Sequence, residues 1–101
     1  METITRQELQ SLLGAFNRVE NAPSRNGYSS APNQFIVKYD NGEVFQSYKS
    51  LIGARINGHY YFTKDHNYSQ TTSKHCKAWC GYGSNERKQG LEDGTFTMIT
   101  D

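Results

Sequence analysis

Two Asn-Gly pairs, each lying between two β-rich runs, constrain the fold of this chain more than any other feature. The first pair, at residues 41–42, lies inside QFIVKYDNGEVFQSY, and the second, at residues 57–58, lies inside LIGARINGHYYFT. Asn-Gly adopts the left-handed backbone of a tight turn at little cost, so such a pair between alternating runs predicts a β-hairpin. A short link at residues 49–50 joins the two hairpins. The sequence therefore predicts an antiparallel four-stranded meander over about residues 34–63.

Two-residue turns also predict which side chains lie opposite each other. Tyr39 should face Val44 in the first hairpin, and Arg55 should face Tyr60 in the second. One face of the first hairpin is then more apolar than the other, and its members are Phe35, Val37, Tyr39, Val44 and Tyr48. An apolar sheet face needs a cover, and the covers that this chain offers are helices.

The N-terminal segment TRQELQSLLGAF predicts a helix over about residues 5–17. Thr5 and Glu8 have the spacing of a capping box, in which each side chain bonds the backbone amide of the other residue. Apolar side chains then recur at helical spacing and form one stripe that should be buried, made of Leu9, Leu12, Leu13 and Phe16.

Residues 17–33 predict a flexible linker between this helix and a core at residues 34–101. Both prolines of the chain lie in this segment, together with a glycine, serines and asparagines. A segment of this length without secondary structure is usually mobile or functional. The chain has 101 residues, and parts of it would be too small to bury a core, so the sequence predicts one domain.

The stretch DHNYSQTTSKHCKAWC predicts a second helix, over about residues 70–80, that covers the sheet. Ser69 or Thr71 can cap its start, and Gly81 is a typical helix stop. The side chains that share its inward face are Thr72, Cys76, Trp79 and Cys80.

The C-terminal segment leaves one alternative open. SNERKQGLEDG, at residues 84–94, is either a short helix or an irregular turn, because it contains two glycines. TFTMIT, at residues 95–100, alternates and predicts a last strand at the edge of the sheet. An exposed edge strand can pair with a second copy and so give a homodimer. Altogether the sequence predicts an α+β fold.

Histidines and cysteines gather in the second half of the chain, at positions 59, 66, 75, 76 and 80. Structural zinc sites need four ligands in two tight pairs, whereas this chain has one Cys-x3-Cys pair and scattered histidines. His75 and Cys76 are adjacent, so on a helix their side chains point about 100° apart and cannot act as base and nucleophile. Buried cysteine commonly behaves as a small apolar side chain. The sequence predicts no catalytic, cofactor-binding or metal-ligating residue and no enzyme.

Charge separates two kinds of binding partner. The formal net charge is +1 and the pI is about 7.8, whereas nucleic-acid-binding domains usually have a pI above about 9. A small nucleic-acid-binding protein remains the alternative, because residues 74–88 place Lys74, Lys77, Arg87 and Lys88 beside the aromatic residues Trp79 and Tyr82. Seven tyrosines in so short a chain favour a protein partner, because interfaces are rich in aromatic side chains.

Three segments, VFQSYKSLIG, GHYYF and DHNYSQTTSKH, resemble a family of small uncharacterised domains that is frequent in phage and mobile-element genomes. The resemblance covers about residues 34–80, and its most specific part is YSQTTSKH at residues 68–75. It departs from the family pattern at His66 and Asn67, and Gly53 interrupts the aliphatic strand. The resemblance implies a phage-encoded accessory protein that binds and blocks a host component, including defence systems such as CRISPR nucleases. It carries over no catalytic residue.

The resulting hypothesis is a non-enzymatic protein that binds a host protein or a host protein–nucleic-acid complex, without a cofactor. Its candidate contact residues are Lys74, His75, Lys77, Tyr82, Arg87 and Lys88. No apolar run approaches the roughly 18 residues that a membrane span requires, and METITRQELQ lacks the basic and apolar regions of a secretory signal. We therefore expect a cytoplasmic protein without a membrane partner, located in the host cytoplasm if it is phage-encoded.

Overall fold

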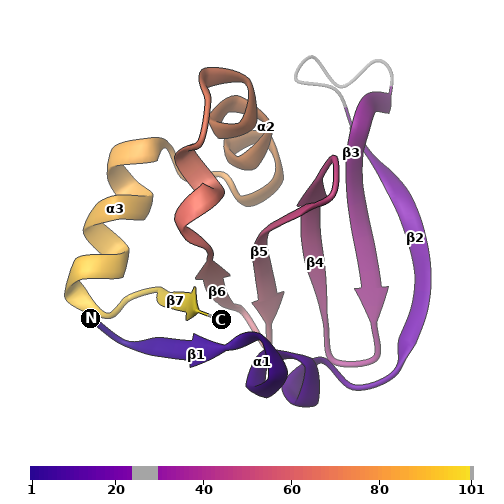
Figure 1. The fold of residues 1–101 in the computed structure, drawn as a ribbon, viewed down its shortest axis with the longest axis horizontal. Helices are drawn as coiled ribbons and strands as arrows, with labels where there is room; N and C mark the ends of the chain where they lie inside the picture. Colours follow the sequence, from indigo (N-terminus) through magenta and orange to yellow (C-terminus); the bar gives the residue numbers. More distant parts are fainter. Residues whose placement is uncertain (24–29, 101) are drawn as a thin grey trace.

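The computed structural model describes residues 1–23 and 30–100, which form a sheet with helices on both of its faces (Figure 1). The strands are β1 (Thr3–Thr5), β2 (Phe16–Pro23), β3 (Ser30–Tyr39), β4 (Gly42–Ser47), β5 (Ser50–Ile56), β6 (His59–Phe62) and β7 (Thr97–Thr100). The helices are α1 (Arg6–Leu13), α2 (Gln70–Cys80) and α3 (Ser84–Asp93), and η1 (Lys64–Asn67) is a 3-10 helix.

Within the described part of the chain, seven strands form one sheet in the order β1-β7-β6-β5-β4-β3-β2. The strands from β6 to β2 pair in antiparallel fashion, whereas β7 runs parallel to both β6 and β1. The α+β class is confirmed. The predicted number of four strands is wrong, because β2 extends the meander on one side and β7 and β1 extend it on the other.

The second hairpin has the predicted register, with Arg55 opposite Tyr60. Its turn has the expected left-handed backbone, with φ of 52° at Asn57 and 80° at Gly58. The prediction for this hairpin is therefore confirmed. It could be made from the sequence because the residues of the turn alone determine its conformation.

The first hairpin is shifted by two residues from the predicted register, so that Val44 lies opposite Val37 rather than Tyr39. Its turn is centred on Asp40 and Asn41, whose backbone amides donate to the carbonyl oxygens of Ala15 and Leu13, each at 3.0 Å. The turn therefore binds the end of α1, a tertiary contact that the Asn-Gly pattern does not reveal.

Gly42 lies inside β4 instead of in the turn. A Cβ atom at Gly42 would collide with the carbonyl oxygen of Arg55 on β5. The glycine of this Asn-Gly pair thus permits the close approach of two strands rather than a left-handed turn.

The capping box at the start of α1 is confirmed. The amide of Glu8 donates to Oγ1 of Thr5 at 3.1 Å, and the amide of Thr5 donates to Oε1 of Glu8 at 3.0 Å. The predicted end at residue 17 is wrong, because the helix stops at Leu13 and Gly14 follows with φ of 80°. Phe16 is consequently not part of the helical stripe but the first residue of β2.

The predicted flexible linker at residues 17–33 is wrong at both of its ends. Residues 17–23 belong to β2 and residues 30–33 belong to β3, and the two strands are paired in antiparallel fashion. Residues 24–29, in the middle of the predicted linker, lie outside the described residues. Composition pointed to a loop, whereas cross-strand hydrogen bonds satisfy this backbone and hold it in the sheet.

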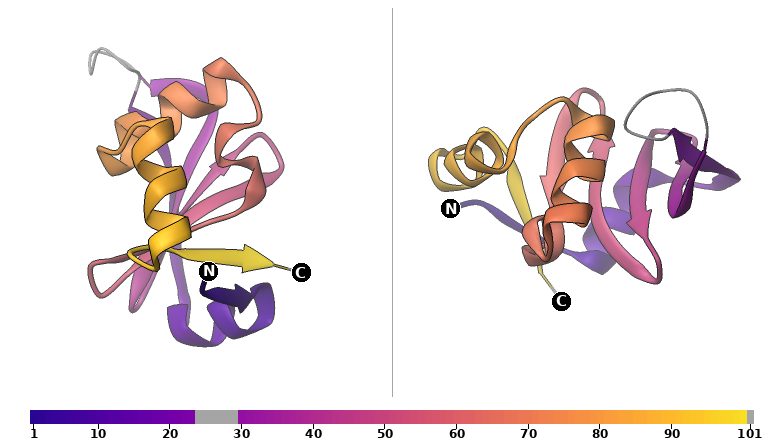
Figure 2. Two further views of the ribbon diagram at one scale, coloured as in Figure 1. Left: turned by 90° about the vertical axis from the view of Figure 1, so that its left-hand side faces the viewer. Right: turned by 90° about the horizontal axis from the view of Figure 1, so that it is seen from above.

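Two apolar clusters lie on opposite faces of the sheet. Residues of α1 pack with Val44, Ala54 and Ile99 on one face, and residues of α2 and α3 pack with Ile36 and Phe45 on the other face. Figure 2 shows α2 and α3 next to each other and α1 apart from them. The apolar face that carries Val37, Tyr39 and Val44 is therefore covered by α1, not by the helix at residues 70–80 as predicted.

Helix α2 has the predicted bounds and the predicted inward face. Ser69 caps its start, because Oγ of Ser69 accepts a 3.1 Å hydrogen bond from the amide of Thr72. Gly81 ends it with φ of 86°. The Trp79 ring stacks on Phe45, with ring centroids 5.5 Å apart.

Residues 84–93 form a helix, which resolves the alternative left open by the sequence. Gly90 lies within α3 and faces Phe96, whose ring a Cβ atom at this position would penetrate. A glycine that weakens a helix in isolation is thus needed here for the packing of α3 on the segment before β7.

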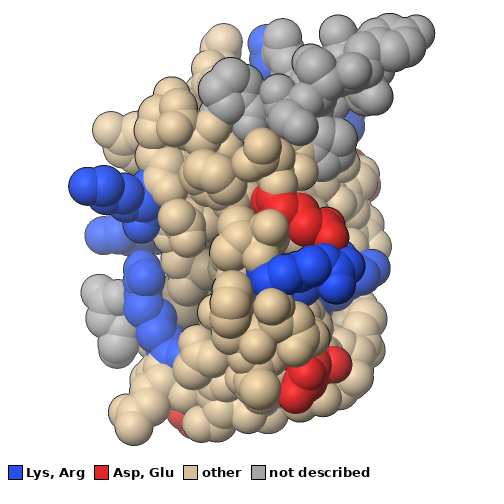
Figure 3. Space-filling view, turned by 90° about the vertical axis from the view of Figure 1, so that its right-hand side faces the viewer, with Lys and Arg blue, Asp and Glu red and all other residues tan. Residues whose placement is uncertain are grey.

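Strand β7 lies between β1 and β6, so the prediction of an edge strand at residues 95–100 is wrong, and so is a homodimer through it. The parallel partner β1 covers the edge that the sequence left open. The sheet ends at β1 and β2 instead. Figure 3 views the molecule from the side on which β2 lies, and basic and acidic side chains lie next to each other in the middle of this surface.

Candidate functional site

Two exposed tyrosines border one pocket at the end of the sheet where β4 turns into β5. The exposed fraction is 63% for Tyr48 and 81% for Tyr68. The pocket has a volume of about 410 Å³, within the range of small-molecule and peptide sites. We call it the tyrosine pocket, and it is lined by Ser47, Tyr48, Ser50, Ile52, Tyr68, Ser69, Thr71 and Thr72.

Tyr48 is held in a backbone conformation that tyrosine rarely adopts. It lies in the tight turn between Ser47 and Ser50, and its φ is 54°. The amide of Tyr48 donates to the carbonyl oxygen of Asn33 at 2.7 Å, and Nε2 of Gln46 donates to the carbonyl oxygen of Tyr48 at 2.7 Å. A non-glycine residue in this region costs about 1–3 kcal/mol, and such strain clusters at functional sites. A tyrosine at a position suited to glycine therefore points to a role for its ring.

Tyr68 lies between η1 and α2, and the capping of both elements turns its side chain outward. The amide of Tyr68 donates to the carbonyl oxygen of Asp65 at 3.1 Å, which closes η1. Oγ of the next residue, Ser69, both caps α2 and donates to Oγ1 of Thr72 at 3.1 Å. These local bonds place the ring of Tyr68 in solvent.

The chemistry of the tyrosine pocket is neutral and rich in hydroxyl groups. Ser69 and Thr72 use their hydroxyls in the helix cap, whereas Ser50, Thr71 and Tyr68 have no side-chain hydrogen-bond partner among the described residues. These hydroxyls can both donate and accept hydrogen bonds, and the two rings offer flat apolar surface. Among the described residues, the pocket lining contains no charged side chain and no histidine. The arrangement is suited to recognising neutral polar groups, such as a peptide backbone.

A second hollow adjoins the tyrosine pocket and shares Tyr68 and Ser69 with it. Its volume is about 480 Å³, and Lys74 supplies a charged side chain to its lining. Tyr68 thus stands between a neutral pocket and a basic one. Of the six contact residues predicted from the sequence, Lys74 is the one that lies at this site.

The other predicted contact residues differ in their exposure to solvent. Lys77 on α2 and Lys88 on α3 are exposed, and His75 is half-buried. Tyr82 is half-buried against the core, where its ring lies 5.0 Å from that of Phe96. The prediction of Arg87 as a contact residue is wrong, because its exposed fraction is 0%.

Arg87 instead joins η1, α2 and α3 in the interior. Its guanidinium donates to Nδ1 of His66 at 2.9 Å, to the carbonyl oxygen of His66 at 3.1 Å and to Oγ of Ser73 at 2.7 Å. It also donates to the carbonyl oxygen of Tyr82 at 2.6 Å. Burial, together with the charges of Arg87 and Lys88, lowers the pKa of His66 to about 4, so His66 is neutral and can accept this bond.

Glu43 is a second polar centre, and it accepts a hydrogen bond from Trp79. The sequence analysis considered Trp79 as a residue that could stack on nucleic-acid bases. Oε2 of Glu43 accepts a 2.9 Å hydrogen bond from Nε1 of Trp79, and Oε1 lies 2.8 Å from Arg55 and 3.1 Å from Lys38. Burial opposes ionisation of Glu43, but the bonds from Trp79 and Lys38 and the charges of Lys38 and Arg55 outweigh it, so its pKa is lowered. Trp79 is therefore a structural residue that ties α2 to the sheet.

The two cysteines are buried one helical turn apart on α2. The hydrogen bond from the Cys76 thiol lowers the pKa of Cys80 to about 7, and the same interaction raises the pKa of Cys76. Across residues 1–23 and 30–100, the structure contains no group of three or more His, Cys, Asp or Glu side chains that could hold a metal ion. No helix in these ranges is long and apolar enough to cross a membrane.

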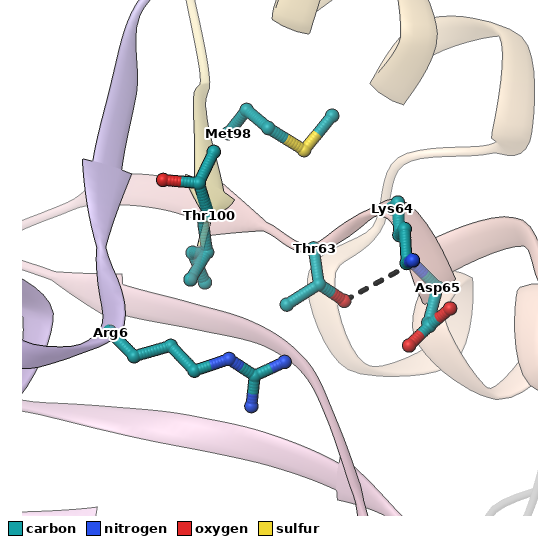
Figure 4. A pocket seen from close by; sticks show the side chains of 7 residues that line it. Arg6, Thr63, Lys64, Asp65, Met98 and Thr100 are labelled. Carbon is teal, nitrogen blue, oxygen red and sulfur yellow. Dashed lines mark hydrogen bonds between the residues drawn. The ribbon is translucent and has the colours of Figure 1, made fainter.

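A further hollow lies where the parallel strands β1, β7 and β6 end, and its volume is about 340 Å³. Figure 4 shows the side chain of Arg6 extending toward Thr63 and Asp65. The hydroxyl of Thr63 donates to the carbonyl oxygen of Leu51 at 2.8 Å and accepts from the amide of Asp65 at 3.3 Å. The hydroxyl of Thr63 is therefore already bonded within the protein, and the lining also carries the charged side chains of Arg6, Lys64 and Asp65.

The sequence did not indicate Tyr48 or Tyr68 as site residues, and it assigned Tyr48 to the apolar face of the first hairpin. Ser47, Tyr48 and Ser50 come from one of the segments that carry the family resemblance, and residues 68–72 come from another. The fold brings these two segments together in the tyrosine pocket. The motif residues in these two segments could have indicated a site, but the sequence could not show that the two segments lie side by side in the fold.

A family model matches residues 19–94, well over half of the chain, and it is described as a family of unknown function (DUF8033). The matched range contains every residue of the tyrosine pocket. This match confirms that the chain resembles a family of uncharacterised small domains. No curated protein and no solved structure matches the chain.

Proposed function

The chain belongs to the family of unknown function DUF8033, and from its own surface chemistry we propose that it is a non-enzymatic binding protein whose tyrosine pocket holds a segment of a protein partner. The observation that carries the proposal is the strained turn that presents Tyr48, with φ of 54°, beside the exposed Tyr68 on one pocket. A glycine would fit this turn without strain, so the tyrosine ring is maintained against a local cost.

The chemistry of the pocket favours a neutral polar segment of a protein as its ligand. Flat aromatic rings and free hydroxyls together bind extended backbone, because the rings cover apolar side chains and the hydroxyls bond the peptide groups. A carboxylate or phosphate ligand would find no positive charge among the described residues that line the pocket.

The resemblance to phage and mobile-element domains adds a setting to the proposal. If the chain is phage-encoded, its partner is a host protein, which this chain modulates or inhibits by binding to it. In its most specific form, the proposal is that this host protein is a component of a defence system. The site of action is then the host cytoplasm. This part of the proposal rests on the resemblance alone.

Nucleic-acid binding is the second candidate function, and one observation favours it. The hollow that adjoins the tyrosine pocket places Lys74 beside Tyr68, and a base could stack on the ring while the lysine contacts a phosphate. The burial of Arg87 and the bond between Trp79 and Glu43 remove two members of the predicted basic-aromatic surface. This candidate therefore ranks second.

The experiment compares proteins captured by the tagged wild-type chain with those captured by Tyr68→Ser. The matched control is Leu12→Ser, since Leu12 is another exposed large apolar residue and does not line the tyrosine pocket. We expect one stoichiometric protein to be captured by the wild type and by Leu12→Ser but not by Tyr68→Ser, and direct binding of the purified pair to show the same order. Nuclease treatment of the lysate should leave the capture unchanged.

Two outcomes would overturn the proposal. Equal capture of the same protein by Tyr68→Ser would remove the tyrosine pocket from the interface. Capture that disappears with nuclease, together with a shift of labelled nucleic acid that weakens steeply with salt and with Lys74→Gln, would establish the second candidate instead.

A further inference from the structure

Strand β2 is an edge strand, and most of it is open to solvent, although Ala22 near its end is buried in the core. Every residue from 16 to 21 is exposed, including Phe16 at 58% and Val19 at 53%. One edge of β2 pairs with β3, and no other strand among the described residues pairs with it. A long edge strand with exposed apolar side chains is a template for pairing with another strand, and globular proteins usually protect such edges.

The charges of β2 are complementary to a second copy of themselves. In an antiparallel pair of two β2 strands centred on Val19, each Arg18 lies opposite the partner's Glu20. Cross-strand pairs of opposite charge stabilise a sheet, and this register makes two such pairs. Within one molecule, Arg18 lies opposite Lys38, a like charge, and bonds Glu20 on its own strand at 2.7 Å. The second copy therefore supplies the opposite charge that the neighbouring strand does not.

The apolar side chains of β2 agree with the same register. Val19 lies opposite Val37, whose side chain packs in the cluster around α1, and the ring of Phe16 lies 6.0 Å from that of Tyr39 on the same cluster. Two β2 strands centred on Val19 would bring the two valines face to face and extend this apolar surface from one molecule to the other. Irregularities in the β2–β3 pairing at both ends of residues 18–21 limit the regular strand to the part that this register uses.

We propose that β2 pairs with β2 of a second copy of this chain, antiparallel and centred on Val19, to give a two-fold symmetric dimer with one continuous sheet. A two-fold axis makes the interface self-complementary, as the Arg18-Val19-Glu20 sequence requires. The dimer uses an edge far along the sheet order from the β7 region that the sequence predicted for this role. It is independent of the ligand of the tyrosine pocket.

The test uses charge reversal and sedimentation velocity at increasing protein concentration. We expect the wild type to dimerise, and Arg18→Glu and Glu20→Arg each to remain monomeric, because each single variant opposes like charges across the axis. An equimolar mixture of the two variants should recover the dimer as a heterodimer, because the two acidic side chains of one strand would then oppose the two basic side chains of the other. This recovery separates loss of the interface from loss of folding, which circular dichroism of each variant checks independently.

A cross-linking pair tests the register. Val19→Cys should form a disulfide-linked dimer rapidly under mild oxidation, because opposite residues in an antiparallel pair bring their Cβ atoms within disulfide reach. Asn17→Cys, which faces Asn21 of the other copy in this register, should cross-link much more slowly. A wild type that stays monomeric at every concentration would overturn the proposal, as would single variants that dimerise like the wild type. Pairing of β2 with a different protein would appear as a monomer whose captured partner is lost in Arg18→Glu.

Discussion

Nε of Arg87 lies 2.9 Å from Nδ1 of His66, and both side chains are buried. The pair joins α3 to η1, and the two residues are 21 positions apart in the chain. All described partners of the guanidinium are neutral acceptors, so its charge is stabilised by hydrogen bonds alone. This arrangement requires His66 to stay neutral, and it makes the packing of both helices dependent on one side chain.

The pH dependence of stability should reflect His66. Its pKa falls from 6.5 to about 4 in the folded protein, so between these values the unfolded chain binds a proton that the folded chain does not. The contribution of His66 to the free energy of unfolding should therefore be fully present above about pH 6.5. The free energy of unfolding should decrease by on the order of 3 kcal/mol as the pH falls toward 4. Urea unfolding across this range measures the effect.

The matched variant for this prediction is His66→Asn, which keeps an acceptor near Nδ1 but does not titrate. Its free energy of unfolding should change less with pH in the same window, whatever its absolute value. A variant with the same pH dependence as the wild type would show that other groups are responsible.

Arg87 should act on stability and not directly on partner binding. Arg87→Lys removes the fork of donors and leaves buried acceptors without partners, so the free energy of unfolding should fall by about 3 kcal/mol. Lys88→Gln, at the exposed neighbouring position, should change it by less than about 0.5 kcal/mol. Chemical denaturation of the two variants makes the comparison. If Arg87→Lys were as stable as the wild type, the buried network would have no energetic role.

Gly90→Ala should destabilise the protein although alanine favours helices. The added methyl group would enter the ring of Phe96, and overpacking of this kind costs about 1–3 kcal/mol, more than the gain of about 1 kcal/mol in helix propensity. Gln89→Ala, on the exposed face of the same helix, is the control and should be neutral or slightly stabilising. Thermal unfolding followed by circular dichroism compares the two; a stabilised Gly90→Ala would show that Phe96 can move aside.

Tyr48→Gly should separate stability from binding. Relief of the left-handed strain, about 1–2 kcal/mol, exceeds or offsets the loss of about 0.5–1 kcal/mol that glycine brings through the unfolded chain. The free energy of unfolding should thus stay constant or rise by about 1 kcal/mol, while capture of the protein partner is lost. Lys49→Gly is the control, because Lys49 does not have positive φ and its replacement should only destabilise. A clear loss of stability in Tyr48→Gly would assign the tyrosine to the fold.

Elements that depend on neighbouring residues could be predicted from the sequence. The turn at Asn57 and Gly58 specifies the second hairpin, and Ser69 and Gly81 specify the ends of α2 through caps that involve residues within four positions. The inward face of α2 follows from helical spacing and is confirmed by the burial of Cys76 and Cys80.

The candidate site could be predicted only in part. The segments around Tyr48 and Tyr68 stood out by their motifs, but whether a tyrosine on a strand or at a helix start is buried depends on what packs above it. Lys74 was predicted as a contact residue and lies in the hollow beside Tyr68. Arg87 was predicted on charge alone, and its burial depends on acceptors from His66 and Tyr82.

The sequence by itself determined the α+β class, the second hairpin, the N-terminal cap of α1 and the full extent of α2, because turns, caps and side-chain periodicity act within a few residues. Only the tertiary structure decided that residues 16–23 form an edge strand, that β7 lies between β6 and β1, and that the first turn moves by one residue, to Asp40 and Asn41, where it binds the end of α1. These features depend on hydrogen bonds and packing between segments far apart in the chain. Local patterns carry no information on which distant backbone will satisfy them.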